Sequence, residues 1–156
     1  MSRKEVCRSA TAPFRDGYNP KQPRGKNGRW LSAGGRIGLA IGAAGQNGAV
    51  HADFSAVRRP AAVSKIAGVN VRGFKHAISN QAVAHIRSRH PNIGAADIQR
   101  LPAIVKTGKV KLGKDHGVNG VARLVYRATV DGVKYEYIGE VRRKKQRIDA
   151  ITLYRL

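Results

Sequence analysis

The sequence of 156 residues is short of acidic side chains. Nine Asp and Glu stand against 30 Lys and Arg, which gives a formal net charge of +21. A charge of this size on a small protein creates a strong positive field, so the expected partner is a polyanion. Nucleic acid is the favoured class. An anionic membrane, a basic tail kept for solubility and a structural protein with a basic surface are the alternatives.

Cysteine is nearly absent, since Cys7 is the only one. A single thiol excludes a disulfide framework and a cysteine-based zinc site. Long apolar runs are missing too, because no stretch approaches the roughly 18 apolar residues that span a bilayer. The N-terminus also lacks a signal-peptide pattern. We therefore expect no stable membrane span and a cytoplasmic location at synthesis, with later delivery or association with a virion left open.

Residues 1–72 lack a regular hydrophobic period. Residues 1–36 are rich in proline, glycine and cations, and such a segment buries too little apolar surface to offset chain entropy. Four glycines at positions 38, 42, 45 and 48 weaken any helix over residues 37–50. This favours a flexible linker there over a short membrane-seeking segment. The stretch VSKIAGVNVRG, which starts at Val63, is expected to form one weak turn or an edge strand. We predict a basic, Gly/Pro-rich flexible extension over residues 1–72.

The pattern changes at Phe74 and predicts a folded domain over residues 73–156. Ser79 is a good N-cap for a helix over residues 80–89, which Pro91 ends. A second helical segment follows from about Ala95, is broken near Pro102 and ends by residue 108. Residues 109–112 form a short strand, and the strands of the C-terminal region follow. The expected class is α+β, with a helix pair packed on a C-terminal antiparallel sheet.

The last 36 residues predict a three-stranded meander. Two runs of period two flank an Asp131-Gly132 turn, which is a β-hairpin signal. If Val130 faces Val133, then Arg127 faces Glu136 and Arg123 faces Glu140, all on one charged face. The opposite face is apolar and carries Leu124, Tyr126, Ala128, Tyr135 and Tyr137. Cross-strand Arg–Glu pairs of this kind are equally typical of a solvated surface.

The face of the third strand, residues 148–154, depends on the basic loop over residues 142–147. A regular hairpin that brings Val141 opposite Ile148 would place Thr152 and Tyr154 on the apolar face. An irregular loop or a bulge would place both hydroxyls on the charged face. The sequence leaves these two registers open.

The histidines favour a metal-free chemistry. His85 and His90 are five residues apart, which turns their side chains about 140° apart on a helix, and no acid lies between them. This spacing disfavours zinc, and we expect neither a metal nor a cofactor. RNA cleavage needs only a proton acceptor, a proton donor and cations, because the ribose 2′-OH is an internal nucleophile. A histidine with an ordinary structural hydrogen bond is the alternative interpretation of His85.

Four stretches carry a resemblance to a known superfamily: HAISNQAVAHIRSRHPNI, ADIQRLPAIVKTGKVKL, LVYRATVDGVKYEYIGEVRRK and ITLYRL. They resemble the phage-type nuclease domains of the barnase, EndoU, colicin ribonuclease and RelE superfamily, over roughly residues 73–156. The resemblance implies a barnase/RelE-like fold and a metal-independent endoribonuclease of the toxin or effector type. Such an enzyme leaves a 2′,3′-cyclic phosphate.

The resemblance also implies roles for individual residues, although members of the superfamily do not share one invariant set. The catalytic assignments are His85, Glu140, Thr152 and Tyr154, all acting on one phosphate. The substrate-binding assignments are Arg123, Arg127, His90, Arg143 and Lys144. The implied partners are an RNA, with tRNA and rRNA both open, and an acidic immunity protein or antitoxin. The alternative function is that of a non-catalytic nucleic-acid-binding or virion-associated basic protein.

Overall fold

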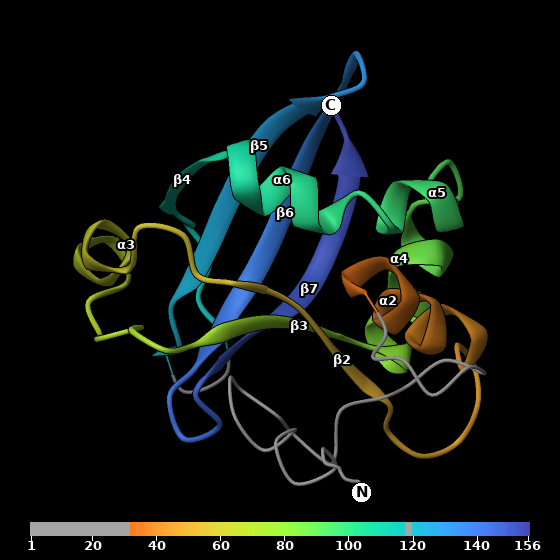
Figure 1. Ribbon diagram of the computed structural model, residues 1–156, viewed down its shortest axis with the longest axis horizontal. Coiled ribbons are helices and arrows are strands. Elements are labelled where there is room, and N and C mark those ends of the chain that lie inside the picture. The colour runs from red at the N-terminus through yellow and green to blue at the C-terminus, as the bar shows by residue number, and fades with distance from the viewer. Residues whose placement is uncertain (1–31, 118–119) are drawn as a thin grey trace, which may run out of the picture. The chain divides into compact units, whose positions relative to one another are not determined.

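The computed structural model describes residues 32–117 and 120–156, which form an α+β domain (Figure 1). In chain order the elements are α2 (Ala33–Gly42), β2 (His51–Ala56), α3 (Pro60–Ala67), β3 (Lys75–Ser79), α4 (Asn80–Arg89), α5 (Ala95–Ile98), α6 (Leu101–Thr107), β4 (Lys109–Leu112), β5 (Arg123–Val130), β6 (Val133–Arg142) and β7 (Arg147–Arg155). The predicted α+β class is confirmed. The disorder predicted for residues 1–36 is contradicted where α2 begins at Ala33, whereas residues 1–31, together with Cys7, lie outside the described residues.

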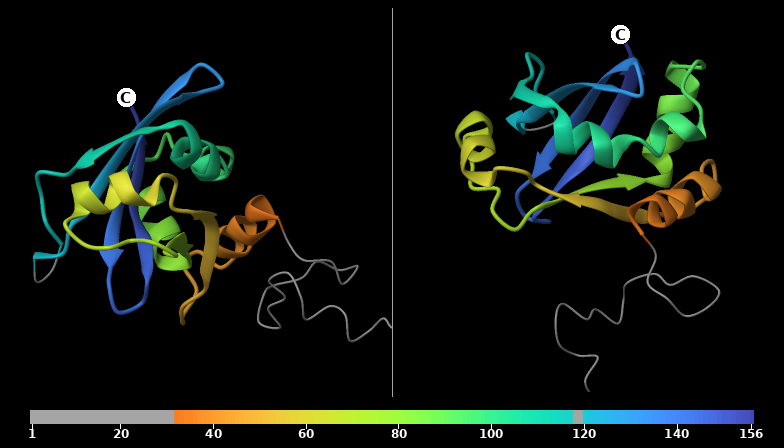
Figure 2. Two further views of the ribbon diagram at one scale, coloured as in Figure 1. Left: turned by 60° about the vertical axis from the view of Figure 1, so that its left-hand side comes forward. Right: turned by 45° about the horizontal axis from the view of Figure 1, so that its top comes forward.

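The strands form one six-stranded sheet in the order β2-β3-β7-β6-β5-β4. Neighbouring strands are antiparallel except β3 and β7, which pair in parallel. Helix α6 crosses one face of the sheet over β5 and β6 (Figure 1), and α3 lies beside β4 (Figure 2). The predicted helix pair on a C-terminal antiparallel sheet is not confirmed, because α2 and α3 also belong to the domain and the sheet is mixed and includes β2 and β3. None of the helices in the described ranges has the length and apolar character needed to cross a membrane.

Residues 33–67 form elements of the folded domain, so the flexible linker predicted over residues 37–50 is wrong, and the flexible extension predicted over residues 1–72 does not hold for this part. Ile37 and Ala40 of α2 have no exposed surface and join the hydrophobic core. Burying an isoleucine side chain is worth about 1.5–3 kcal/mol, which exceeds the roughly 1 kcal/mol that a helical glycine costs. Gly34 also leaves room for the Gln99 side chain, whose Oε1 lies 3.2 Å from the position of an added Cβ. Tertiary packing thus stabilises a helix that local propensity opposes.

Asn80 ties this N-terminal part to α4. Its buried side chain accepts a hydrogen bond from the Val50 N–H at 2.9 Å. Its amide nitrogen donates to three backbone carbonyls of the α2–β2 connection, those of Ala43, Gln46 and Gly48. Because a buried amide is costly unless its hydrogen bonds are made, Asn80 fixes the path of the chain into β2. Ser79 caps α4, as predicted, by accepting from the Ala82 N–H at 3.0 Å.

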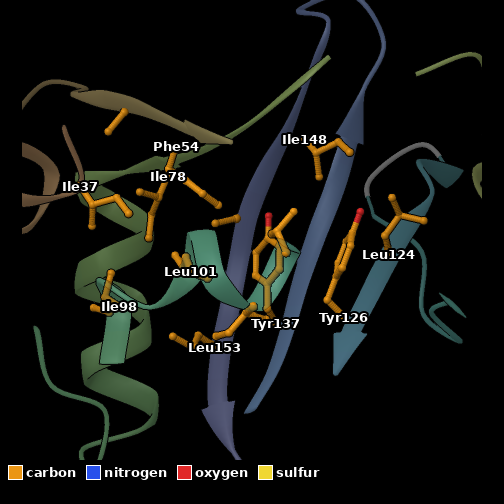
Figure 3. Close-up of a cluster of buried hydrophobic side chains, with 14 of the residues drawn as sticks. Ile37, Phe54, Ile78, Ile98, Leu101, Leu124, Tyr126, Tyr137, Ile148 and Leu153 are labelled. Atoms are coloured by element: carbon orange, nitrogen blue, oxygen red, sulfur yellow. The ribbon is translucent and has the colours of Figure 1, made fainter. Parts of the chain in front are cut away.

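The β5–β6 hairpin has the predicted register. Val130 faces Val133, Arg127 faces Glu136 and Arg123 faces Glu140. The opposite face enters the core through Leu124, Tyr126, Tyr135 and Tyr137, all at most 2% exposed. Figure 3 shows Leu124, Tyr126 and Tyr137 in the core. Successive side chains of a strand point to opposite faces of the sheet, which explains this separation of charged and apolar side chains.

His76 lies in the core between two tyrosines. Its Nδ1 is 3.0 Å from the Tyr137 Oη, and its Nε2 is 3.3 Å from the Tyr126 Oη. Burial lowers the pKa of His76 to about 3, so the ring is neutral at physiological pH. His76 is therefore a structural residue whose two nitrogens are satisfied by tyrosine hydroxyls.

Candidate nuclease site

A charged face lies on the side of β5, β6 and β7 that points away from the apolar core. The strand register assigns it Arg123, Arg127, Glu136, Glu140, Asp149, Thr152 and Tyr154. Lys109 and Lys111 extend this face onto β4, because they lie opposite Arg127 and Val125. Seven residues of this face, including its extension onto β4, have charged side chains. Four of them are cations and three are carboxylates. We take this face as the candidate functional surface.

An extra residue in β7 places Thr152 and Tyr154 on the charged face. Val141 lies opposite Ile148, as in a regular hairpin, and Gly139 lies opposite Ala150. Ile138 then pairs with Thr152, so Ile151 is left without a partner, which is a β-bulge. The bulge brings Tyr154 opposite Glu136. The regular hairpin and the charged-face position, which the sequence presents as alternatives, are therefore both present.

The tyrosine cluster comprises His90, Arg127, Glu136 and Tyr154. The Tyr154 hydroxyl and the Arg127 Nε both donate to the Glu136 carboxylate. Glu136 is 5% exposed. The His90 ring, from the end of α4, lies 5.2 Å from the Tyr154 ring between centroids. The cluster joins a cation, a carboxylate and two aromatic side chains in one contact network.

The pKa values in the tyrosine cluster follow from these contacts. Burial opposes ionisation of Glu136, but the hydrogen bonds from Tyr154 and Arg127 and the charge of Arg127 outweigh it and lower the pKa of the carboxyl. Burial and the hydrogen bond to Glu136 raise the pKa of Tyr154 to about 12. At neutral pH Glu136 is therefore ionised and Tyr154 keeps its proton. A carboxylate held in this way is a weak base, whereas Tyr154 remains a hydrogen-bond donor.

A second network, the arginine–carboxylate row, crosses the same face four residues further along β6. Glu140 is 3% exposed and accepts from the Arg123 Nε at 3.0 Å. It also pairs with the Arg142 Nη2 at 2.8 Å. Asp149 pairs with the Arg147 Nε at 2.5 Å and with the Arg142 Nε at 3.5 Å. Three guanidinium groups thus share two carboxylates, which leaves an excess of positive charge.

The loop before β5 packs against this row. A Cβ added at Gly117 would lie 2.0 Å from the Glu140 Oε2, so no side chain fits at that position without moving the carboxylate. Gly117 therefore allows the backbone to approach Glu140 closely.

The histidine cleft adjoins the arginine–carboxylate row where β7 begins. It has a volume of about 510 Å³ and is lined by His51, His85, Arg142, Lys145, Arg147 and Asp149, among others. His51 comes from β2, His85 from α4, and the charged residues from the end of β6, the β6–β7 turn and β7. Both histidines are exposed. Within the described ranges, no group of three or more His, Cys, Asp or Glu residues is placed to hold a metal ion.

The structure divides the predicted catalytic residues between these places. His85 lines the histidine cleft, whereas Tyr154 belongs to the tyrosine cluster. Glu140 lies four residues along β6 from Glu136, the partner of Tyr154, which corresponds to about 13 Å. The four residues that were predicted to act on one phosphate therefore do not lie together at one point of the charged face. Thr152 lies between the two networks, and its buried Oγ1 has no hydrogen-bond partner among the described residues.

The predicted substrate-binding residues are divided in the same way. Arg127 and His90 belong to the tyrosine cluster, and Arg123 to the arginine–carboxylate row. Arg143 and Lys144 lie in the β6–β7 turn, where they line a separate cleft of about 540 Å³. That cleft also has an apolar wall, which includes Val69 and Val121.

His51, Arg147 and Asp149 are site residues that no pattern in the sequence indicated. The segment His51–Ala56 alternates exposed and buried positions, with Ala52 and Phe54 buried at 3% exposure. Such an alternation is typical of a strand, and it would place His51 on the outward face of that strand. Its proximity to His85 depends on the pairing of β2 with β3, which no local pattern indicates.

Comparison with known proteins identifies the class. Residues 55–156 match the family described as phage-Barnase-EndoU-ColicinE5/D-RelE like nuclease 3. The chain belongs to this family and carries a nuclease domain of that type, which confirms the resemblance seen in the sequence. No curated protein and no solved structure matches the chain. His51 lies before the matched segment, whereas the rest of the histidine cleft lies within it.

Proposed function

We propose that the domain is a metal-independent endoribonuclease whose reaction takes place in the histidine cleft. The observation that supports this most is that His85, Arg147 and Asp149 line one cleft on the charged face. A concave site in which a histidine meets several cations is suited to a phosphodiester. Membership of the family indicates the nuclease activity. The RNA substrate, the metal-independent mechanism and the location of the reaction in the histidine cleft are proposed.

The chemistry of RNA fits the groups in this cleft. The 2′-OH attacks the adjacent phosphorus, so the protein needs to move two protons and to offset the charge of the phosphorane. Histidine can carry a proton near neutral pH, and His85 is exposed enough to reach a bound substrate. Arg142 and Arg147, both aligned by Asp149, supply guanidinium groups. The products are a 2′,3′-cyclic phosphate and a free 5′-OH.

Charge balance favours the histidine cleft over the tyrosine cluster as the reaction centre. Arg142, Lys145 and Arg147 line the cleft with Asp149, and Glu140 also pairs with Arg142, so three cations stand against two carboxylates and the cleft is positive overall. In the tyrosine cluster, Arg127 and Glu136 form an ion pair and cancel each other. Developing negative charge is stabilised by cations that are not already neutralised. The histidine cleft meets this requirement better.

The tyrosine cluster then binds a neighbouring nucleotide of the same strand. His90 and Tyr154 present aromatic rings on which a base can stack. Arg127 is 54% exposed and can contact a phosphate while its Nε stays on Glu136. An RNA strand that follows β7 would contact the histidine cleft first and the tyrosine cluster next. Thr152 lies between them and is proposed to help position the strand.

An acidic immunity protein or antitoxin is the protein partner that the same charge supports. The net charge of +21 provides long-range attraction to an acidic surface. Such a protein would compete with RNA for the charged face. The proposed role of the chain is that of a toxin or effector.

Incubation of the purified protein with an RNA oligonucleotide in EDTA tests the proposed function. The expected result is cleavage that leaves 2′,3′-cyclic phosphate ends. A matched oligonucleotide with a single 2′-deoxynucleotide at the cut position should resist cleavage there, because the nucleophile is missing. Cleavage only in the presence of magnesium would contradict the mechanism. Tight, salt-sensitive binding without cleavage would instead support the non-catalytic alternative.

A further inference from the structure

His51 enters the histidine cleft from the edge strand of the sheet. It lies opposite Ser79 in the β2–β3 pair, two positions from the Asp53–Ala77 pair. Ala77 in turn lies opposite Asp149 of β7. Side chains two residues apart along a strand share a face, so His51 and Asp149 lie on the same side of the sheet. The cleft therefore receives one histidine from β2 and one from α4.

Among the side chains that line this cleft, the two histidines are of the type that ordinarily gains and loses a proton near neutral pH. Asp149 is held by Arg147 and Arg142, and Glu140 behind it is 3% exposed and held by two arginines. The oxygens of both carboxylates are thus occupied by guanidinium groups of the protein, so neither carboxylate is placed to contact a bound 2′-OH. No described residue makes a hydrogen bond or ion pair with the side chain of His51 or His85. Both are exposed and can approach a bound phosphodiester.

We infer that His51 and His85 act as a pair, with His51 accepting the 2′-OH proton and His85 donating a proton to the 5′-oxygen. This inference rests on the proposed function of the cleft. The 2′-oxygen forms a bond to phosphorus while its proton passes to a ring nitrogen of His51. The bond from phosphorus to the 5′-oxygen breaks, and that oxygen takes the proton of the His85 imidazolium. The two rings end in exchanged protonation states, and proton exchange with water restores them.

The surroundings of His51 support its part as the acceptor. Burial and the positive charge of Arg147 lower its pKa, and Lys145 acts in the same direction. Asp149 and Asp53 oppose them, and the net direction is downward from 6.5. His51 is therefore unprotonated at neutral pH, as a base must be. Arg142 and His85 are the remaining titratable groups of the cleft that face it.

Measurements of kcat on two substrates distinguish the role of proton acceptor from that of proton donor. The full-length protein is used in EDTA. The first is a ribodinucleotide, whose 5′-oxygen needs a proton to leave. The second is a ribonucleoside 3′-(4-nitrophenyl phosphate), whose nitrophenolate leaves without one. His51→Gln should lower kcat about 100-fold or more on both substrates. His85→Gln should cause such a loss on the ribodinucleotide alone. The KM should stay within about threefold in both variants.

Three further measurements exclude a merely structural role. In the wild type, kcat/KM should rise with pH while His51 loses its proton, and His51→Gln should lack this acid limb. Imidazole should restore part of the activity of His51→Ala. The matched control is His116→Gln, which removes an exposed histidine that does not line the cleft and should leave kcat unchanged. Equal melting temperatures of the variants would show that folding is intact.

The outcomes are distinguishable from failure of the proposed function. An active wild type with a His51→Gln variant that keeps its kcat and its acid limb would overturn the inference and leave the ribonuclease intact. The reversed substrate pattern, with His51→Gln active on the nitrophenyl ester and His85→Gln inactive on it, would also overturn the assignment. A wild type that cuts neither substrate would overturn both proposals together.

Discussion

Tyr154 lies directly opposite Glu136 on adjacent strands and donates its hydroxyl hydrogen to that carboxylate. The contact exists because β7 contains one extra residue, Ile151, between Ala150 and Thr152. Without that bulge, Tyr154 would point into the apolar core and Glu136 would lose a donor. The bulge therefore connects β7 to the charged face and completes the tyrosine cluster.

Replacement of Tyr154 by phenylalanine tests this contact. Glu136 is buried and ionised, so its negative charge should be stabilised less when one hydrogen-bond donor is lost. We expect a loss of about 1–3 kcal/mol in the free energy of unfolding, the usual cost of a missing hydrogen bond to a charged group. Urea denaturation measures it. In the proposed function the same variant should raise the KM for RNA more than it lowers kcat, because Tyr154 contacts a neighbouring nucleotide.

Substitution of Gly117 by alanine tests the close approach of the loop to Glu140. The new Cβ would displace the Glu140 carboxylate and, with it, the arginines that it aligns. We expect kcat/KM on RNA to fall at least about tenfold, as for misplaced positioning groups. Gly42→Ala is the matched control, since no atom lies within 4 Å of its added Cβ. Gly42→Ala should leave the activity unchanged, and equal activity of both variants would contradict the role assigned to Glu140.

The pH dependence of stability should report on Asp97. Burial alone would raise its pKa, but hydrogen bonds from Tyr135, Gly94 and Arg155 outweigh this and lower it. A carboxyl with a lowered pKa stabilises the fold above its unfolded value of about 3.9, and this contribution is lost as the pH falls through the folded value. Wild-type stability should therefore fall in acid.

The Asp97→Asn variant provides the comparison. It should be less stable than the wild type at neutral pH, and the difference should shrink as the pH falls below about 4. Denaturant unfolding at several pH values measures both proteins. A difference that stays constant over the acid range would show that the charge of Asp97 does not contribute.

Salt dependence tests the part of the β6–β7 turn in RNA binding. Each phosphate contact on a single strand adds about 0.7 to the slope of log affinity against log salt. The double variant Arg143→Gln/Lys144→Gln should therefore reduce the slope by roughly 1.4. Fluorescence anisotropy with a labelled RNA, over a series of salt concentrations, gives the slope. Lys106→Gln on α6 removes an exposed cation that lines neither this cleft nor the histidine cleft, and an equal reduction there would contradict the assignment.

The hairpin could be predicted from the sequence because its signals are local. The Asp131-Gly132 turn sets the register, and the alternation of each strand assigns its faces. Arg123 and Glu140 were therefore placed opposite each other correctly. The helix α4 was equally accessible, since Ser79 and Pro91 mark its limits.

Other features depend on contacts between distant parts of the chain. The glycines of α2 indicate a linker, and the helix forms because Ile37 and Ala40 pack in the core. The bulge at Ile151 cannot be recognised in the sequence Ala150-Ile151-Thr152, because these side chains fit either register. His51 lies 34 positions before His85, and only the pairing of β2 with β3 brings both to one cleft.

The most direct test of the account is the effect of His85→Gln on cleavage and on binding, measured with the same RNA in EDTA. The wild type should cut this RNA without a divalent metal ion. The variant should lose about 100-fold or more in kcat, as expected for the loss of a proton donor, while its Kd for RNA stays within about threefold. An equal loss of binding and cleavage would show that His85 is structural, and unchanged cleavage would place the reaction outside the histidine cleft.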